Sequence, residues 1–207
     1  MTNLVLLDFD RTLFRSDDHS EALLEVVISH NLIESDHAEE LRSEMFSSEN
    51  TVDTSAILRR RGINPDVVFE YVRKLNDTFM YGDAQEFLDG LSDFHVVTTA
   101  TDVVEQQAKL KLAGLHDKAT ILPGAKKGEY LVKTLAREGD KLVFPDHHPS
   151  QQYDSVVLID DRYDAIEAVV GTPGVRTILI QRDDAKYEYG GSHPSIEVVK
   201  TLKEISL

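Results

Sequence analysis

The second half of the chain alternates short apolar runs with helical segments, and this rhythm limits the possible folds more than any other feature. An apolar run without alternation indicates a strand buried on both faces, as in a parallel sheet covered by helices. We therefore expect an α/β fold with a parallel sheet sandwiched by helices. The expected strands are 4–8, 94–98, 119–122, 155–159 and 176–180, and the expected helices are 83–91, 102–113, 128–138, 163–170 and 194–205.

A purely helical segment interrupts this alternation after the first strand. No convincing strand pattern occurs there, and Asn64 with Pro65 forms a typical helix start. We expect two parts: a core formed by 1–13 and 82–207, and an inserted all-helical cap formed by 14–81. The helices expected in the insertion are 19–31, 36–46, 53–61 and 65–80, and residues 139–154 are expected to be an extra loop or hairpin.

The composition excludes several classes of function. Lys and Arg number 22 against 37 Asp and Glu, for a net charge of −15, which argues against a general nucleic-acid binder. The absence of Cys excludes disulfides, thiolate metal sites and a cysteine nucleophile. No apolar stretch approaches the roughly 20 residues of a membrane helix, and no signal peptide is evident. We expect a cytoplasmic protein without a membrane partner, and the sequence does not indicate its oligomeric state.

Carboxylates gather where two of the expected strands end. Asp8 and Asp10 end or follow the first strand, and Asp160, Asp161 and Asp164 follow the strand at 155–159. The carboxyl ends of parallel strands meet at one edge of the sheet, where ligands bind. Carboxylates held close together repel one another and require a cation, and a site made of oxygen ligands suits Mg²⁺. Asp8 could be a nucleophile and Asp10 an acid and base.

Hydroxyl and ammonium groups are expected at the same edge. Thr98 ends the strand at 94–98 and could bind a phosphoryl oxygen, with Thr99 as its rival. Lys126 and Lys127 open the helix at 128–138, and either could offset negative charge in a transition state. We favour Lys127.

These motifs resemble those of the haloacid dehalogenase-like (HAD) superfamily. The run Asp8–Leu13, Asp-Phe-Asp-Arg-Thr-Leu, is similar to its first motif. Thr98 resembles the second motif and Lys127 the third, and Ile159–Asp164, Ile-Asp-Asp-Arg-Tyr-Asp, resembles the fourth. Order and spacing agree over nearly the whole chain. The resemblance implies a Rossmann-like core, and the insertion at 14–81 resembles the small helical (C1-type) cap of the phosphatase branch.

The resemblance also implies roles for the acids. Asp8 would attack phosphorus and ligate Mg²⁺. Asp10 would protonate the leaving group and then activate water, with its backbone carbonyl on the metal. Asp160 would be the main carboxylate ligand of the fourth motif, assisted by Asp161 or Asp164. Because the related haloalkanoate dehalogenases lack the second acid, Asp10 favours phosphate esters.

Basic and imidazole groups outside these motifs have more than one interpretation. Arg60, within the run 59–61, either binds an anionic group of the substrate or is a solvated helix end. Arg11 is a further substrate-binding candidate, although Gly is commoner at that position of the motif. His147 and His148 form either a metal site or a mobile loop, and Arg182 either lines the cleft or belongs to a plain loop.

Together these features indicate a Mg²⁺-dependent phosphomonoester hydrolase that acts on a small phosphorylated metabolite through an aspartyl-phosphate. The alternatives are a sugar phosphomutase of the same superfamily and a non-catalytic relative that binds a phosphorylated ligand.

Overall fold

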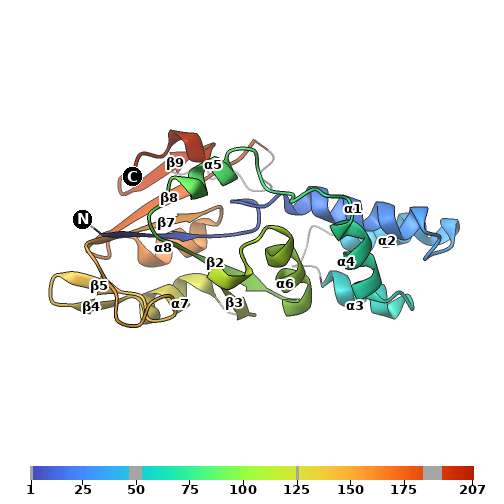
Figure 1. The fold of residues 1–207 in the computed structure, drawn as a ribbon, viewed down its shortest axis with the longest axis horizontal. Helices are drawn as coiled ribbons and strands as arrows, with labels where there is room; N and C mark the ends of the chain where they lie inside the picture. The colour runs from blue at the N-terminus through green and yellow to red at the C-terminus, as the bar shows by residue number, and fades with distance from the viewer. Residues whose placement is uncertain (1, 47–52, 125, 184–192) are drawn as a thin grey trace. The chain divides into compact units, whose positions relative to one another are not determined.

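The main sheet is built from strands that lie far apart in the sequence (Figure 1). The computed structural model describes residues 2–46, 53–124, 126–183 and 193–207. Within them, a six-stranded sheet has the order β3-β2-β1-β7-β8-β9, in which β2, β1, β7, β8 and β9 pair in parallel. Its strands are β1 (Asn3–Leu7), β2 (Phe94–Ala100), β3 (Ala119–Pro123), β7 (Ser155–Asp160), β8 (Val175–Ile180) and β9 (Ile196–Val199). The expected α/β fold with a parallel sheet is confirmed.

The two central strands are as apolar as the sequence indicated, and they set the register of the site. Residues 4–7 of β1 and 156–160 of β7 are all buried. Leu7 pairs with Ile159, and the amide of Asp8 donates to the carbonyl of Ile159 at 2.9 Å. Asp8 and Asp160 therefore come level at the carboxyl edge of neighbouring strands.

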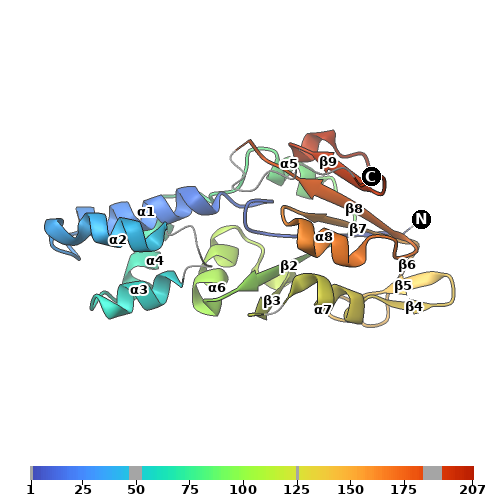
Figure 2. The same cartoon turned by 180° about the vertical axis from the view of Figure 1, so that it is seen from behind.

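Helices cover both faces of this sheet. α7 (Lys127–Thr134) and α8 (Tyr163–Val169) pack together on one face, and α5 (Ala84–Asp89) lies on the other (Figures 1 and 2). Two 3₁₀ turns, η2 (His116–Lys118) and η3 (Leu202–Glu204), complete the helical elements of this part of the fold. Both faces of the sheet are thus shielded from water, which explains the continuous apolar runs.

The helix expected at 194–205 is wrong. Residues Ile196–Val199 form the edge strand β9 beside β8, and only η3 follows it. The segment carries Ile196, Val198 and Val199, whose branched side chains suit a strand. The segment forms a strand and not a helix because it pairs with the edge of β8. The local sequence pattern does not indicate this pairing.

Two other expected helices end early. α7 stops at Thr134, and β4 (Ala136–Glu138), β5 (Lys141–Val143) and β6 (Gln152–Tyr153) form a small antiparallel sheet. Gly139, with a φ of 63°, makes the turn between β4 and β5, so the extra hairpin begins before 139.

The helix expected at 65–80 ends early, at Arg73. Asn76 and Phe79, which follow it, have positive φ angles of 58° and 53°.

A second compact unit contains residues 15–79 together with 100–116, and the first contains the rest of the chain. The segment 100–116 was assigned to the core on sequence, and here it packs with the insertion. In the described part of 15–79 there are helices and no strand. The helices of this unit are α1 (Ser16–Ser29), η1 (Ser35–His37), α2 (Ala38–Met45), α3 (Thr54–Arg60), α4 (Pro65–Arg73) and α6 (Val103–Leu112). The Asn64 side chain caps α4 by accepting from the amide of Asp66 at 3.1 Å, as its sequence predicts.

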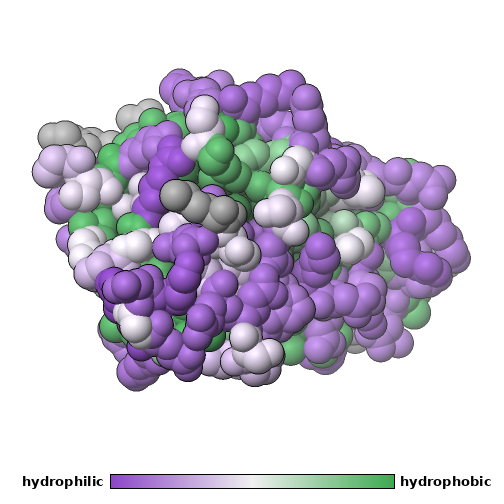
Figure 3. All heavy atoms as spheres, turned by 60° about the vertical axis from the view of Figure 1, so that its left-hand side comes forward, coloured by the Kyte–Doolittle hydropathy of each residue, from purple (hydrophilic) through white to green (hydrophobic). Residues whose placement is uncertain are grey.

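Hydrophilic side chains cover most of the face shown in Figure 3, with smaller hydrophobic areas between them. This distribution agrees with a chain in which 29% of residues are charged. In the part of the chain that the structure describes, no helix combines the length and the apolar character needed to cross a membrane.

Candidate active site

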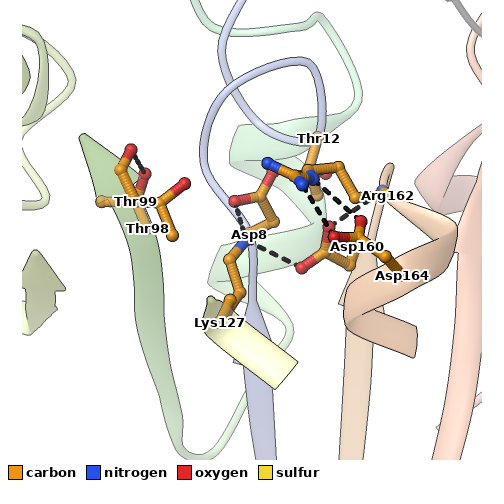
Figure 4. Close-up of polar contacts among 8 residues, drawn as sticks. All are labelled: Asp8, Thr12, Thr98, Thr99, Lys127, Asp160, Arg162 and Asp164. Carbon is orange, nitrogen blue, oxygen red and sulfur yellow. Dashed lines mark hydrogen bonds and ion pairs between the residues drawn. The ribbon is translucent and has the colours of Figure 1, made fainter. Parts of the chain in front are cut away.

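Asp8 lies just beyond β1, and its carboxylate is held by side chains from two directions (Figure 4). The Lys127 ammonium, at the first residue of α7, donates to one carboxylate oxygen of Asp8. The Thr12 hydroxyl donates to the other oxygen at 3.4 Å. The side chains of Asp8 and Lys127 are only 7% and 3% exposed. The carboxylate is therefore oriented and largely removed from water.

The end of β7 brings further acids to Asp8. Asp160 is fully buried, and its two oxygens accept from Lys127 Nζ at 2.8 Å and from the backbone amide of Arg162 at 2.9 Å. Ligand oxygens of Asp8, Asp160 and Asp161 all lie within 4.8 Å of one another. We call these three residues the acidic cluster.

The acidic cluster carries unfavourable electrostatics that one lysine only partly relieves. Burial and the neighbouring carboxylates of Asp8 and Asp160 raise the pKa of Asp161. Burial also raises the pKa of Asp160, with Asp8 adding to the effect and Lys127 opposing it. Burial works against the charge of Lys127, but Asp160 and Asp8 outweigh it and raise the pKa of the ammonium. Closely spaced oxygen donors that resist ionisation fit a divalent cation, and oxygen ligands suit Mg²⁺.

Gly128 allows Lys127 to reach the acidic cluster. A Cβ atom at position 128 would lie 2.4 Å from the Cβ of Ala168 and 3.3 Å from the backbone oxygens of Ala165 and Asp164 in α8. The first turn of α7 therefore packs directly against α8, which places Lys127 beside β1 and β7. Sequence reasoning missed this role, although a glycine at a helix start was a signal for close approach.

Of the two candidate lysines, the structure brings Lys127 and not Lys126 to the acids. The Lys126 side chain is 80% exposed, and its ammonium lies 3.3 Å from the Glu129 carboxylate. The side chain of Asp164 is also mainly exposed, and both its oxygens accept from the Arg162 guanidinium, at 3.0 and 2.7 Å (Figure 4). That hydrogen-bonded pair lowers the pKa of Asp164.

The remaining sequence-predicted residues lie around the edge of the sheet or in the second unit. Thr98 is buried near the end of β2, where its hydroxyl donates to the carbonyl of Thr99 at 3.4 Å (Figure 4). Asp10 and Arg11 are half-buried in the loop after Asp8. Arg11 has a φ of 60°, a left-handed conformation that suits Gly, which explains why Gly is commoner there. Arg60 belongs to the second unit.

Arg60 pairs with an acid of its own unit. Its guanidinium lies 3.4 Å from the Glu44 carboxylate, and its side chain is 66% exposed. Arg61 also pairs with Glu44, and it contacts Glu40 at 3.5 Å. These ion pairs agree with a solvated helix end.

Arg182 supports the loop that follows Asp8. Its buried guanidinium donates to the backbone carbonyl of Thr12 at 2.7 Å and to the Asp83 carboxylate at 2.9 Å. It also lies over the Tyr81 ring, 3.8 Å from the centroid. The same Asp83 oxygen accepts from the amide of Leu202 at 2.8 Å. The sequence signal was the position of Arg182 directly after β8, at the carboxyl edge of the sheet.

Solved structures share the fold of this protein over almost the full chain. A protein assigned as a haloacid dehalogenase-like hydrolase from Burkholderia xenovorans matches with a TM-score of 0.68 at 15% identity, over 98% of this chain and 94% of its own. The chain has the fold of the haloacid dehalogenase-like hydrolases. YfnB of Bacillus subtilis, assigned as a HAD-hydrolase and solved with bound magnesium, matches with a TM-score of 0.56 at 15% identity, over 98% of this chain and 96% of its own. A HAD phosphatase of Thermococcus onnurineus matches with a TM-score of 0.56 at 17% identity, over 98% of this chain and 95% of its own.

At this level of identity the HAD comparisons show the fold and leave the reaction to be argued from the site. No family model matches the sequence, and no curated protein matches it.

Proposed function

We propose that this HAD-fold protein is a hydrolase of the superfamily that cleaves small phosphomonoesters with Mg²⁺ as its cofactor. The observation that carries the proposal is the buried Asp8 carboxylate, oriented by Lys127 and Thr12 and placed beside Asp160 and Asp161. A carboxylate held in this way is suited to attack a phosphoryl group, because its position and orientation are set before substrate binds.

The proposed reaction has two steps. An oxygen of Asp8 forms a bond to phosphorus while the bond between phosphorus and the ester oxygen breaks, and Asp10 gives its proton to the departing alkoxide. Asp10 then takes a proton from water as that water attacks phosphorus, and the bond to Asp8 breaks to release phosphate. Atoms and protons balance, and Asp10 returns to its starting state.

The other residues of the site would stabilise negative charge on the substrate or hold the metal ion. Lys127 would counter the negative charge on the phosphoryl oxygens, and the Thr98 and Thr99 hydroxyls are candidates to bind them. The donors that would hold Mg²⁺ are the carboxylates of Asp8, Asp160 and Asp161, together with the backbone carbonyl of Asp10. When bound, Mg²⁺ supplies positive charge that offsets the charge of the transferring group. Asp164 is an unfavourable ligand because Arg162 occupies both its oxygens.

We further propose that the helical insertion 14–81 selects the leaving group. The cap of this class closes on substrate and excludes water, and loops or domains that close in this way commonly set specificity. Arg11 and Arg60 remain the proposed contacts for an anionic substrate group, although Arg60 would first have to leave the Glu44 carboxylate.

The decisive experiment measures phosphate release from an aryl phosphate with Mg²⁺ and with chelator. We expect Mg²⁺-dependent release by the wild type and a loss of about 10³-fold or more in Asp8→Asn. Asp183→Asn is the matched control, since this exposed acid pairs with Lys200 and should retain activity.

Each alternative predicts a different result, in that experiment or in a parallel assay with its own substrate. Wild-type rates in Asp8→Asn would remove the nucleophile assignment. Release of halide from a 2-haloacid without phosphatase activity would indicate a dehalogenase. An isomerised sugar phosphate would indicate a mutase, and a tight Mg²⁺-dependent complex without turnover would indicate a binding protein.

Asp10→Asn tests the acid and base assignment separately. We expect slower ester cleavage and slower hydrolysis of the intermediate, by roughly 10²–10⁴-fold, because a positioned proton donor and acceptor is lost. Rapid-quench measurements of the phosphorylated enzyme and of product resolve the two steps. A pH–rate profile identical to that of the wild type would contradict the assignment.

A further inference from the structure

A second group of metal-ligating side chains lies away from the acidic cluster. Asp93 immediately precedes β2, at its amino end, whereas the acidic cluster lies at the carboxyl edge of the sheet. His147 and His148 belong to the segment between β5 and β6. One ligand atom from each of these three residues lies within 4.8 Å of the others. We call them the histidine cluster.

The donor chemistry of the histidine cluster differs from that of the acidic cluster. Two imidazoles and one carboxylate suit Zn²⁺ and related divalent transition metals, whereas carboxylates alone suit Mg²⁺. Ligands on one tetrahedral Zn²⁺ lie about 3.4 Å apart, given metal–ligand bonds of about 2.0–2.1 Å. The observed limit of 4.8 Å is wider than this, so binding of an ion would require the three donors to approach one another.

Asp93 is held as a metal ligand would be held. Its Oδ1 lies 2.7 Å from Nε2 of His147, whereas its Oδ2 accepts from the Gln151 amide at 3.1 Å and from the Tyr153 hydroxyl at 2.9 Å. Gln151 and Tyr153 would therefore orient the carboxylate, and an ion bound by Oδ1 and His147 Nε2 would replace the direct contact between these two atoms. Such outer hydrogen bonds are a regular part of metal sites.

A third imidazole adds nitrogen donors beside the cluster. The His95 ring is 4% exposed, and its centroid lies 4.8 Å from that of His147. Its Nε2 lies 2.9 Å from the Thr120 hydroxyl, and its Nδ1 has no hydrogen-bond partner in the described part of the chain. A buried nitrogen without a hydrogen-bond partner calls for an explanation, and a nearby ion-binding site is one of the recognised explanations.

His148 distinguishes a metal site from a hydrogen-bonded loop. The hydrogen bonds to Asp93 account for the positions of His147, Gln151 and Tyr153 without any ion. His148 is exposed and makes none of these bonds, yet its ring centroid lies 4.1 Å from that of His147. One of its ring nitrogens lies within 4.8 Å of ligand atoms of Asp93 and His147, and this proximity is the geometric reason to consider it as a ligand.

We propose that Asp93, His147 and His148 bind one Zn²⁺ ion, which ties the segment between β5 and β6 to the amino end of β2. Three protein ligands would leave one position of a tetrahedral ion for water or another donor, and the site does not depend on the proposed hydrolase activity. The experiment uses chelator-stripped full-length protein without a polyhistidine tag. Zn²⁺ is titrated by calorimetry with Mg²⁺ in excess, so that the acidic cluster is occupied, and Co²⁺ absorption reports the ligand geometry.

We expect one equivalent of Zn²⁺ that excess Mg²⁺ does not displace, with binding at least about tenfold weaker in His148→Gln and in Asp93→Asn. His148→Gln is the sharper variant, because an exposed side chain outside the hydrogen bonds can be replaced without unfolding the loop. His37→Gln, an exposed histidine of the second unit, should bind as the wild type does. Wild-type affinity in His148→Gln, or Zn²⁺ binding that Mg²⁺ or Asp8→Asn abolishes, would overturn the site.

Discussion

At the scale of single residues, Asp161 lowers the stability of the metal-free protein as pH rises. Burial, together with the carboxylates of Asp8 and Asp160, raises its pKa. The folded protein then retains a proton at pH values where the unfolded chain, with the ordinary pKa of 3.8, has released it. Without metal, this residue therefore lowers the stability of the fold as pH rises above 3.8. A bound cation would remove the penalty by favouring the ionised form.

Replacing Asp161 by Asn should reverse this pH dependence. In chelator, we expect the melting temperature of Asp161→Asn to gain on that of the wild type as pH rises, because the variant cannot ionise. Each unit by which the pKa is raised corresponds to about 1.4 kcal/mol. In saturating Mg²⁺ the order should reverse, since the variant lacks one ligand. Thermal unfolding over a pH series, in chelator and in Mg²⁺, measures both effects. A difference in melting temperature that stays constant with pH in chelator would contradict the raised pKa.

At the scale of elements, the contact between α7 and α8 determines where Lys127 lies. Gly128→Ala would force its new methyl group against the Cβ of Ala168, so we expect the first turn of α7 to move. The free energy of unfolding should fall by about 1–3 kcal/mol, as for other overpacked sites, and the proposed phosphatase activity should fall as Lys127 shifts. Thermal unfolding and phosphate release measure the two effects.

The double variant Gly128→Ala/Ala168→Gly is the matched test of that contact. Removing the opposing Cβ should restore part of the activity and give a favourable coupling between the two sites. Gly90→Ala is the control, because its new Cβ would meet no atom closer than 3.4 Å. If the double variant loses as much activity as Gly128→Ala alone, the contact with Ala168 does not position the lysine.

At the scale of the whole molecule, Arg182 joins segments that are far apart in the chain. It binds Thr12, 170 residues away, and Asp83, 99 residues away, while Asp83 binds Leu202. The side chains of Arg182 and Asp83 are both under 10% exposed. Removing one member of a buried pair costs far more than removing an exposed one, because the other charge is left without a partner.

Arg182→Met should therefore destabilise the protein by about 3–5 kcal/mol, and Asp83→Asn by a similar amount. The double variant should lose less free energy of unfolding than the two single variants together. Chemical unfolding of all four proteins, as a double-mutant cycle, measures this difference. We also expect the proposed phosphatase activity to be reduced in Arg182→Met, because the Thr12 carbonyl loses its donor and the loop with Asp10 loosens. Strictly additive effects would contradict the direct pair.

The sequence by itself determined the features that depend on short-range pattern. Continuous apolar runs determined the buried parallel strands around Asp8 and Asp160, and the polar residues that follow those strands determined where a site could form. Tertiary structure alone decided what depends on a distant partner. It made Ile196–Val199 a strand because β8 offers an unpaired edge, and it ended α7 at Thr134 because β4 pairs with β5. It also brought Lys127 and not Lys126 to the acids, because the packing of Gly128 against α8 sets how α7 faces the sheet.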